Sequence, residues 1–214
     1  MILADINTKG YIEIENFFNV KNFEKLQNKV NKLIEKKPNT NFTLTDLQLD
    51  NENIVQFEDI PGFRELIENF YKFENKKLNF NDCYKVLRVL KGNDSNKDNS
   101  NFHFDGFYLT AMFPIIIPQN NSGDNGDFVI VPNIRRIYKS KLINNLIKAI
   151  FQNFLIKIFY KTKLFNYFFN AKVIRPKEGS LILFRGFQSL HGSAKLEKNR
   201  TRATLLYHIS NMKN

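Results

Sequence analysis

The chain has 214 residues, enough for one domain with a full-sized core and too few for two ordinary domains. Hydrophobic residues make up 43% of it and aromatic residues 14%, which excludes intrinsic disorder and predicts a sizeable buried interior. The formal net charge is +11, from 32 basic and 21 acidic side chains, which suggests nucleic acid, an acidic ligand or an anionic membrane as partner.

The positive charge is concentrated in one segment. No acidic residue lies between Asp127 and Glu178. The segment carries eleven basic residues: Arg135, Arg136, Lys139, Lys141, Lys148, Lys157, Lys161, Lys163, Lys172, Arg175 and Lys177. These equal the whole excess, so the rest of the chain is electrically balanced.

Other features exclude further classes of protein. The single Cys83 excludes a disulfide framework and a multi-cysteine zinc site, and it predicts a reducing, cytoplasmic location. The first ten residues have no basic start followed by an apolar run, so we expect no secretory signal. Nowhere does an uncharged apolar run reach the length of a membrane-spanning helix.

The first elements expected along the chain are one strand and two helices. Residues 11–18 alternate apolar and polar side chains like a short strand. Residues 20–36 have the amphipathic pattern of a helix that ends before Pro38, and residues 61–73 predict a second helix.

From Asp82 onward the pattern changes to β. Short runs rich in β-branched and aromatic residues alternate with clusters of Asn, Asp, Gly and Pro, which predicts strands at residues 84–90, 107–117, 128–131, 172–175, 180–184 and 202–209. Helices followed by a set of short strands indicate an α+β fold in which the strands form a sandwich or barrel. No internal repeat or long linker occurs, so we expect a single domain.

One long amphipathic helix is predicted inside the β half. Over residues 142–159 apolar pairs recur every four residues, which is the pattern of a helix of roughly 20 residues. We expect its apolar stripe to lie across the barrel, because such stripes usually face a core. Its basic polar face and aromatic-rich apolar face also fit a helix on a membrane surface, and a lid or a subunit contact is a third interpretation.

Two of the three histidines lie in a pattern that suits a metal ion. His103 precedes Asp105 by two positions, and residues i and i+2 of a strand point to the same face, so an imidazole and a carboxylate emerge side by side. His191, after the strand expected at 180–184, is the candidate third ligand. Two histidines and one carboxylate are the ligand set of non-haem Fe(II) oxygenases, which leaves positions on iron open for a co-substrate and O2.

An arginine and a serine follow His191 at a spacing that suits binding of a dicarboxylate. Ser193 comes two residues after His191. Arg202 comes eleven residues after His191 and opens an apolar strand. A guanidinium pairs bidentately with a carboxylate and a hydroxyl donates a further hydrogen bond, so the two could hold the distal carboxylate of a 2-oxo dicarboxylic acid. The third histidine, His208, is expected to be structural.

These motifs, in this order, resemble the non-haem Fe(II), 2-oxoglutarate-dependent dioxygenases, and specifically their phytanoyl-CoA dioxygenase-like branch. The resemblance covers most of the chain and rests on residues 10–18 before a helix, His103-Phe104-Asp105, Asn125-Gly126-Asp127 with the strand ending at Pro132, and His191-Gly192-Ser193 with Asn199 and Arg202. It implies a double-stranded β-helix, a cupin-like jelly roll, with iron inside the barrel.

The resemblance also implies a domain plan and a reaction. Residues 1–214 would form one dioxygenase-like domain, with the N-terminal strand and helices in residues 1–80 and the jelly roll in 82–214, interrupted by a basic helical insertion at about 138–170. Fe(II), 2-oxoglutarate and O2 are the implied cofactors, and hydroxylation of a small molecule with release of succinate and CO2 is the implied reaction. Asp105 stands where related halogenases have a small residue, which favours hydroxylation or desaturation over halogenation.

The same resemblance assigns roles to individual residues. His103, Asp105 and His191 would ligate iron, and Arg202 with Ser193 would bind 2-oxoglutarate. Arg200 is the alternative for the latter role, because other branches use its spacing of nine residues after His191. We prefer Arg202, although the two arginines share a strand face and alternation does not separate them.

Four further residues are candidates for the substrate pocket: Tyr84, Arg88, Phe107 and Tyr108. Tyr84 and Arg88 share one face of a predicted strand, where they equally suit a surface ladder, and the other two aromatic residues equally suit ordinary core. Positive charge beside the pocket favours an anionic substrate.

A different class of function also fits the charge. The protein could be a metal-binding β-barrel module whose basic helix, through residues 140–160, makes peripheral contact with a membrane surface or a polyanion. Nucleic-acid binding is disfavoured, because the basic run has no recognised motif and no interleaved Arg and aromatic residues on strands.

Overall fold

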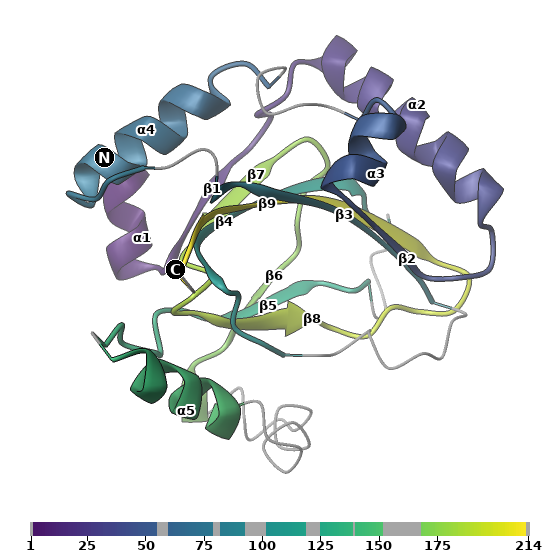
Figure 1. The fold of residues 1–214 in the computed structure, drawn as a ribbon. Helices are drawn as coiled ribbons and strands as arrows, with labels where there is room; N and C mark the ends of the chain where they lie inside the picture. Colours follow the sequence, from purple (N-terminus) through teal and green to yellow (C-terminus); the bar gives the residue numbers. More distant parts are fainter. Residues whose placement is uncertain are drawn as a thin grey trace.

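Two antiparallel sheets face each other in the middle of the molecule (Figure 1). The computed structural model describes residues 2–54, 60–78, 82–92, 102–118, 125–138, 140–151 and 168–212. Within these residues, helices cover the outer side of the larger sheet, and one helix lies beyond the smaller sheet. This is the jelly-roll architecture that the sequence predicts, with the site between the sheets.

The larger sheet has the strand order β1-β7-β4-β9-β3-β2, and each neighbouring pair is antiparallel. Its strands are β1 (Tyr11–Ile14), β2 (Phe42–Thr45), β3 (Tyr84–Lys91), β4 (Phe107–Ile116), β7 (Leu181–Phe184) and β9 (Thr201–Asn211). Strand β4 is apolar almost throughout, and most residues of β9 are buried, because both central strands are covered by helices on one side and by the smaller sheet on the other.

The smaller sheet consists of three antiparallel strands in the order β6-β5-β8. They are β5 (Phe128–Val131), β6 (Lys172–Ile174) and β8 (Leu190–Ser193). Phe128 and Ile130 of β5 pack against Met112, Ile182 and Phe184 of the larger sheet, and this contact joins the two layers.

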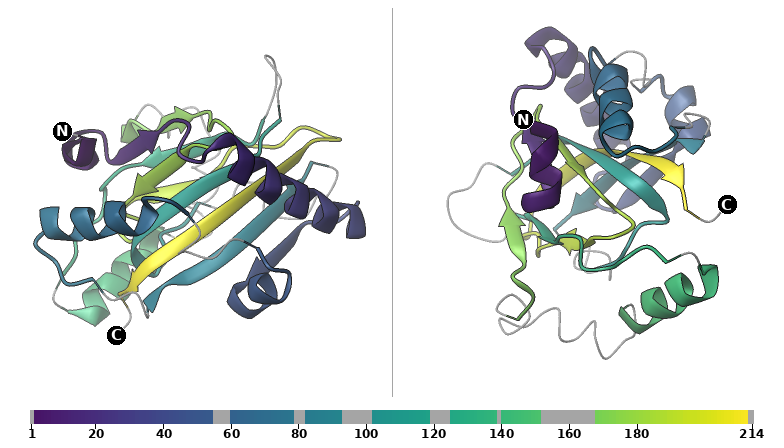
Figure 2. Two further views of the ribbon diagram at one scale, coloured as in Figure 1. Left: turned by 90° about the horizontal axis from the view of Figure 1, so that it is seen from above. Right: turned by 90° about the vertical axis from the view of Figure 1, so that its left-hand side faces the viewer.

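Three helices cover the outer face of the larger sheet (Figure 2): α2 (Val20–Lys36), α3 (Asp46–Asn51) and α4 (Phe63–Phe73). Helix α2 begins after Asn19, whose side chain accepts a hydrogen bond from the Asn22 N–H at 2.9 Å, and its buried residues recur at helical spacing. A 3-10 turn, η1 (Ile2–Ala4), and α1 (Asp5–Thr8) precede β1.

Strand β3 shows how the pleat separates the core from the site. Leu87 and Val89 point into the helix-covered core, whereas Val86, Arg88 and Leu90 line a cavity on the opposite face. Successive residues of a strand point to opposite faces, so one strand contributes to both.

The elements with long apolar patterns are confirmed within a few residues, including the helix predicted at 20–36. Five of the described elements were not predicted: η1, α1, β2, α3 and β8. Strand β8, with the sequence Leu-His-Gly-Ser, has no alternating pattern and is a strand because it pairs with β5. Tertiary pairing overrides local propensity there.

The long helix predicted at 142–159 is described only in part, as α5 (Lys141–Phe151), and its second half lies outside the described residues. The expectation that its stripe crosses the barrel is wrong for the described half. Leu142 is 79% exposed, Leu146 61% and Ile150 50%. At its end, Phe151 packs edge-on against Phe104, with ring centroids 5.6 Å apart.

Among the described residues, no helix combines the length and the hydropathy needed to cross a membrane. The single-domain organisation with the boundaries given above stays a prediction.

Candidate metal centre

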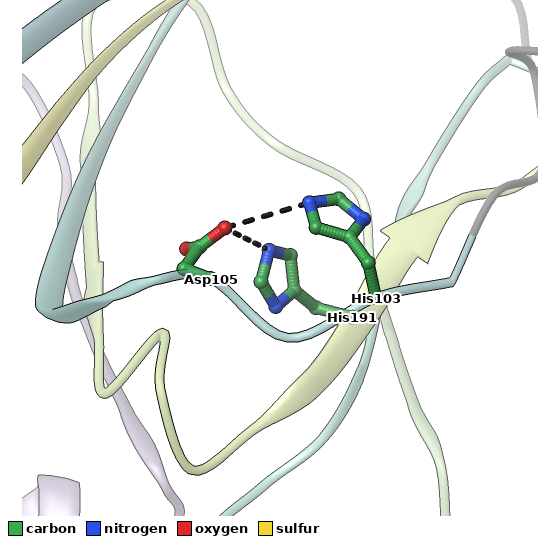
Figure 3. Close-up of side chains that lie close together, drawn as sticks. All are labelled: His103, Asp105 and His191. Atoms are coloured by element: carbon green, nitrogen blue, oxygen red, sulfur yellow. Dashed lines mark ion pairs between the residues drawn. The ribbon is translucent and has the colours of Figure 1, made fainter. Parts of the chain in front are cut away.

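The three predicted ligands meet at one point between the sheets (Figure 3). His103 and His191 exchange backbone hydrogen bonds of 2.9 and 3.0 Å across an isolated antiparallel bridge, which sets their rings side by side. The Nε2 atoms of His103 and His191 lie 3.4 and 3.5 Å from Oδ1 of Asp105. Within the described residues this is the one group of ligating side chains close enough to hold a metal ion.

Hydrogen bonds orient His191 and Asp105 for metal binding. Nδ1 of His191 lies 2.9 Å from the Ser189 carbonyl oxygen, which can only accept, so Nδ1 carries a proton and Nε2 is the ring nitrogen that faces the site. The Thr110 hydroxyl donates to Oδ2 of Asp105 at 2.5 Å, which leaves Oδ1 toward the histidines. Such outer contacts fix the orientation of metal ligands.

The third histidine belongs to this site. His208 Nδ1 lies 3.1 Å from the Thr110 hydroxyl oxygen. Because that hydroxyl gives its proton to Asp105, it must accept from His208, so His208 carries its proton on Nδ1. His208 has the structural role that we expect, since it contacts Thr110 and Asp105 and helps to orient them. Its ring also lines the cavity.

Asp105 is buried and remains ionised. Burial by itself would raise its pKa. The nearby His191 and His208, followed by hydrogen bonds from His103 and His191, outweigh burial and hold the pKa of Asp105 well below its usual value. The carboxylate is therefore charged and available to a cation.

Gly186 makes room for this carboxylate. A Cβ atom at this position would lie 2.3 Å from Oδ2 of Asp105 and 2.4 Å from Oγ1 of Thr110. The Gly186 carbonyl also accepts a hydrogen bond from the Asp105 N–H at 3.0 Å. Only glycine allows the turn at residues 185–189 to lie this close to the ligand.

Two buried arginines hold the loops around the ligands. Arg185 donates to the carboxylate of Glu74 at 2.6 Å, at the end of α4. The Arg135 guanidinium lies 4.5 Å from the ring centroid of Phe104 and 3.8 Å from that of Phe187. Arg135 thus packs between the loop that carries His103 and Asp105 and the turn that carries Gly186, where cation–π contacts link the two.

A cavity of about 270 Å³ opens beside the ligands. Arg202 and Ser193 line it, as do all three ligands. Arg202 is only 4% exposed, and its Nη1 donates to the Gly126 carbonyl oxygen at 2.5 Å and to the Ser193 hydroxyl at 2.6 Å. Among the residues that the structure describes, its Nε has no hydrogen-bond partner, and Nη2 reaches the Met112 sulfur at 3.8 Å.

The structure separates the two candidate arginines. Arg200 is 41% exposed in its side chain, pairs with Glu197 at 3.7 Å and lies outside the cavity that Arg202 lines. Strand alternation does not apply to Arg200, because it precedes β9, which begins at Thr201.

The four candidates for the substrate pocket have different positions. Arg88 lines the cavity. Tyr84 and Phe107 do not line it but stack on His208, with ring centroids 6.2 and 5.4 Å from the His208 ring. Tyr108 was wrongly placed in the pocket: it packs against Phe70 and Tyr71 of α4 and donates a hydrogen bond to Glu74. Tyr108 belongs to the core between the larger sheet and the helices, which is the alternative given above for this residue.

Thr110, Gly186 and Arg135 were missed by the sequence analysis. Thr110 lies in the run predicted as a strand and has no local signal of its own. Gly186 follows a buried strand and comes five residues before His191, so a glycine between two strand ends was the one available hint.

Comparisons with known proteins bear on the fold of the chain. No family model and no curated protein matches the sequence. Solved structures do match. A structure described as prolyl 4-hydroxylases from Phytophthora capsici superposes with a TM-score of 0.60 at 14% identity, over 99% of this chain and 62% of that chain.

Two further structures extend the comparison. The non-haem α-ketoglutarate-dependent epimerase SnoN from nogalamycin biosynthesis has a TM-score of 0.62 at 13% identity, covering 98% of this chain and 79% of that one. HygX from Streptomyces hygroscopicus, crystallised with nickel and 2-oxoglutarate, has a TM-score of 0.55 at 17% identity, covering 98% and 86%.

The fold is that of 2-oxoglutarate-dependent enzymes. The comparisons do not specify the phytanoyl-CoA dioxygenase-like branch, which stays a prediction. The chain spans 62% of the length of the Phytophthora protein.

The donor set of this site fits Fe(II). Two imidazoles and one carboxylate converge, and the hydrogen bonds around them turn Nε2 of His191 and Oδ1 of Asp105 toward the place of a metal ion. The three ligands line the cavity, so a bound ion would be open to it.

Proposed function

We propose that the protein is a non-haem Fe(II)- and 2-oxoglutarate-dependent oxygenase that hydroxylates a small molecule. The observation that carries the proposal is Arg202, a buried cation with an unpartnered Nε in the same cavity as the His103, Asp105 and His191 cluster. Burial of a guanidinium nitrogen without a hydrogen-bond acceptor is costly, and this supports a carboxylate as the ligand of the cavity.

The residues that line the cavity fall into two groups, one that would bind the metal and one that would bind the co-substrate. His103, Asp105 and His191 would hold Fe(II). The Ser193 hydroxyl accepts from Arg202 and so keeps its own proton free to donate to the distal carboxylate of 2-oxoglutarate. The Arg202 fork supplies the charge and further donors.

Bound Fe(II) supplies the activation of O2, coupled to oxidative decarboxylation of 2-oxoglutarate to succinate and CO2 and to hydroxylation of a C–H bond. The protein orients the co-substrate, and it excludes water with the apolar lining residues Met112, Phe128, Phe184 and Leu206.

The experiment that tests the proposal is anaerobic addition of Fe(II) and then 2-oxoglutarate to the purified protein. We expect a weak visible charge-transfer band that needs both additions, a rise in unfolding temperature with 2-oxoglutarate, and succinate release on admitting O2. A metal-binding module without this activity would show neither the band nor an effect of 2-oxoglutarate on unfolding.

Replacing Arg202 by leucine should raise the dissociation constant of 2-oxoglutarate roughly 100-fold, because loss of one partner of a buried charge pair typically costs about 2–5 kcal/mol. The matched control is Arg200→Leu, at an exposed arginine outside the cavity, which should change it by less than about twofold. The anaerobic titration measures both constants. If Arg200→Leu raised the dissociation constant of 2-oxoglutarate more than Arg202→Leu did, the co-substrate would be assigned to Arg200.

A cytoplasmic location and peripheral membrane contact through residues 140–160 stay predictions. The exposed Leu142, Leu146 and Ile150 of α5 support the second of these, together with the absence of acidic residues between Asp127 and Glu178.

A further inference from the structure

A second cavity, of about 260 Å³, lies at the end of β3. The residues that line it come from the segment after α2, from the end of β3 and from the start of β9: Pro38, Asn39, Lys91, Asn199, Arg200 and Thr201. None of them lines the cavity of the metal centre. On β3, Leu90 lines the metal-site cavity, so its neighbour Lys91 points to the opposite face of the sheet. The two cavities are therefore separate.

Lys91 is the buried charge of this second cavity. The residue is only 8% exposed. Burial lowers the pKa of its ammonium group, and no carboxylate among the described residues offsets that effect. Within the same part of the chain the ammonium has neither an ion pair nor a hydrogen bond. Burial of an ammonium group without an acceptor is costly, and this supports an anion as the ligand of the cavity.

The segments that border the cavity supply no free acid to balance Lys91. Residues 37–41 and 195–201 contain four basic side chains and one acidic side chain, that of Glu197. Glu197 pairs with Arg200 at 3.7 Å, and both side chains are largely exposed. Lys198 is exposed as well. The surroundings of Lys91 are therefore positive, which favours the approach of an anion.

Backbone hydrogen bonds hold the walls of the cavity in place. The Lys91 N–H donates to Oδ1 of Asn41 at 2.6 Å, which ties the segment after α2 to β3. The Gly92 N–H donates to the Arg200 carbonyl oxygen at 2.9 Å, and Thr201 pairs with Lys91 across the two strands. The cavity is thus formed before a ligand binds, so little conformational entropy is lost on binding.

We propose that Lys91 is the cationic centre of a second binding site, and that this site takes a phosphate group. The ammonium supplies the charge. The Asn39 amide and the Thr201 hydroxyl, which line the same cavity, are groups that donate hydrogen bonds to phosphate oxygens. A phosphate monoester carries about −1.5 to −2 at pH 7 and offers three free oxygens, which suits a lysine in positive surroundings better than a carboxylate does. The site goes beyond the proposed oxygenase function and does not depend on it.

The test is calorimetric titration of inorganic phosphate into the full chain without added metal. Ionic strength is kept constant with NaCl, so that general screening does not change during the titration. Lys91→Met removes the charge, and Lys91→Arg keeps it. Lys198→Met is the matched control, because it removes an exposed lysine that does not line the cavity. Arg202→Leu removes the buried cation of the metal-site cavity instead.

We expect phosphate to bind wild type and Lys91→Met to weaken that binding about 30-fold or more. Lys91→Arg should retain part of the affinity, since the charge remains. Lys198→Met and Arg202→Leu should each stay within about threefold of wild type. Without phosphate, Lys91→Met should unfold at the wild-type temperature or above it, because the buried charge has been removed. That measurement distinguishes lost binding from lost folding.

Three results would overturn the inference. In the first, wild type gives no heat of binding with phosphate. In the second, Lys91→Met binds phosphate as tightly as wild type does. In the third, Arg202→Leu abolishes binding and Lys91→Met does not, which would place phosphate in the metal-site cavity. A failed test of the oxygenase function would leave each of these results unchanged, since no metal or 2-oxoglutarate enters the titration.

Discussion

Replacing His191 by alanine is expected to abolish the release of succinate from 2-oxoglutarate and to remove the stabilisation that Fe(II) confers. The imidazole supplies one of the three donor atoms, and its Nδ1 contact with Ser189 holds the ring in place. Two donors, on His103 and Asp105, remain in the variant. The lost ligand is not replaced by any other described His, Cys, Asp or Glu side chain within reach.

The measurement is the unfolding temperature with and without Fe(II), together with succinate release under air. At a metal concentration 100 times the dissociation constant, wild type should gain about 2.7 kcal/mol of stability, whereas the variant should gain little. His191 also contacts the rings of Phe184 and His103, so some loss of stability is expected even without metal. Succinate release at the wild-type rate would show that His191 is not a ligand.

Gly186→Ala is expected to lower metal affinity on the order of 100-fold, although the substitution adds one methyl group to a residue that does not itself bind metal. The new Cβ atom would lie 2.3 Å from the Asp105 carboxylate and 2.4 Å from the Thr110 hydroxyl, so both must shift. The displaced carboxylate would lose its hydrogen bond from Thr110 and its alignment with the two histidines.

A second glycine separates this effect from a general loss of stability. Gly62 has a φ of +74° and nothing within 4 Å of its missing Cβ, so Gly62→Ala should cost about 1 kcal/mol through the backbone alone and leave metal affinity unchanged. Metal affinity is measured for both variants by anaerobic titration. Wild-type affinity in Gly186→Ala would mean that the turn at 185–189 does not constrain Asp105.

The ligand set was predictable because it needed only short-range information. His103 and Asp105 are two residues apart, and His191, Ser193 and Arg202 follow in a spacing that matches a known family. The structure brings these five residues to one cavity. The helix at 20–36 and most strands were predictable for a similar reason, since their apolar periodicity is local.

Residues that act through distant contacts were not predictable. The role of Thr110 comes from its hydrogen bonds with Asp105 and with His208, which is 98 residues away. No sequence pattern around Thr110 predicts either hydrogen bond. The prediction for Tyr108 was wrong because aromatic character alone does not show whether a ring lies in the cavity or in the core under the helices. The stripe of α5 looked like one that faces a core, yet Leu142 and Leu146 are exposed.

The net charge of +11 first suggested a polyanionic partner. Its position along the chain shows what the sequence alone can determine. Composition placed the whole excess in one acid-free segment, and motif spacing identified the metal ligands and Arg202. Only the tertiary structure decided that Arg202 and not Arg200 enters the cavity, that Arg88 joins it there, and that His208 supports Asp105. The physical reason is that charge and periodicity are properties of neighbouring residues, whereas burial and the pairing of charges depend on which strands the fold places side by side.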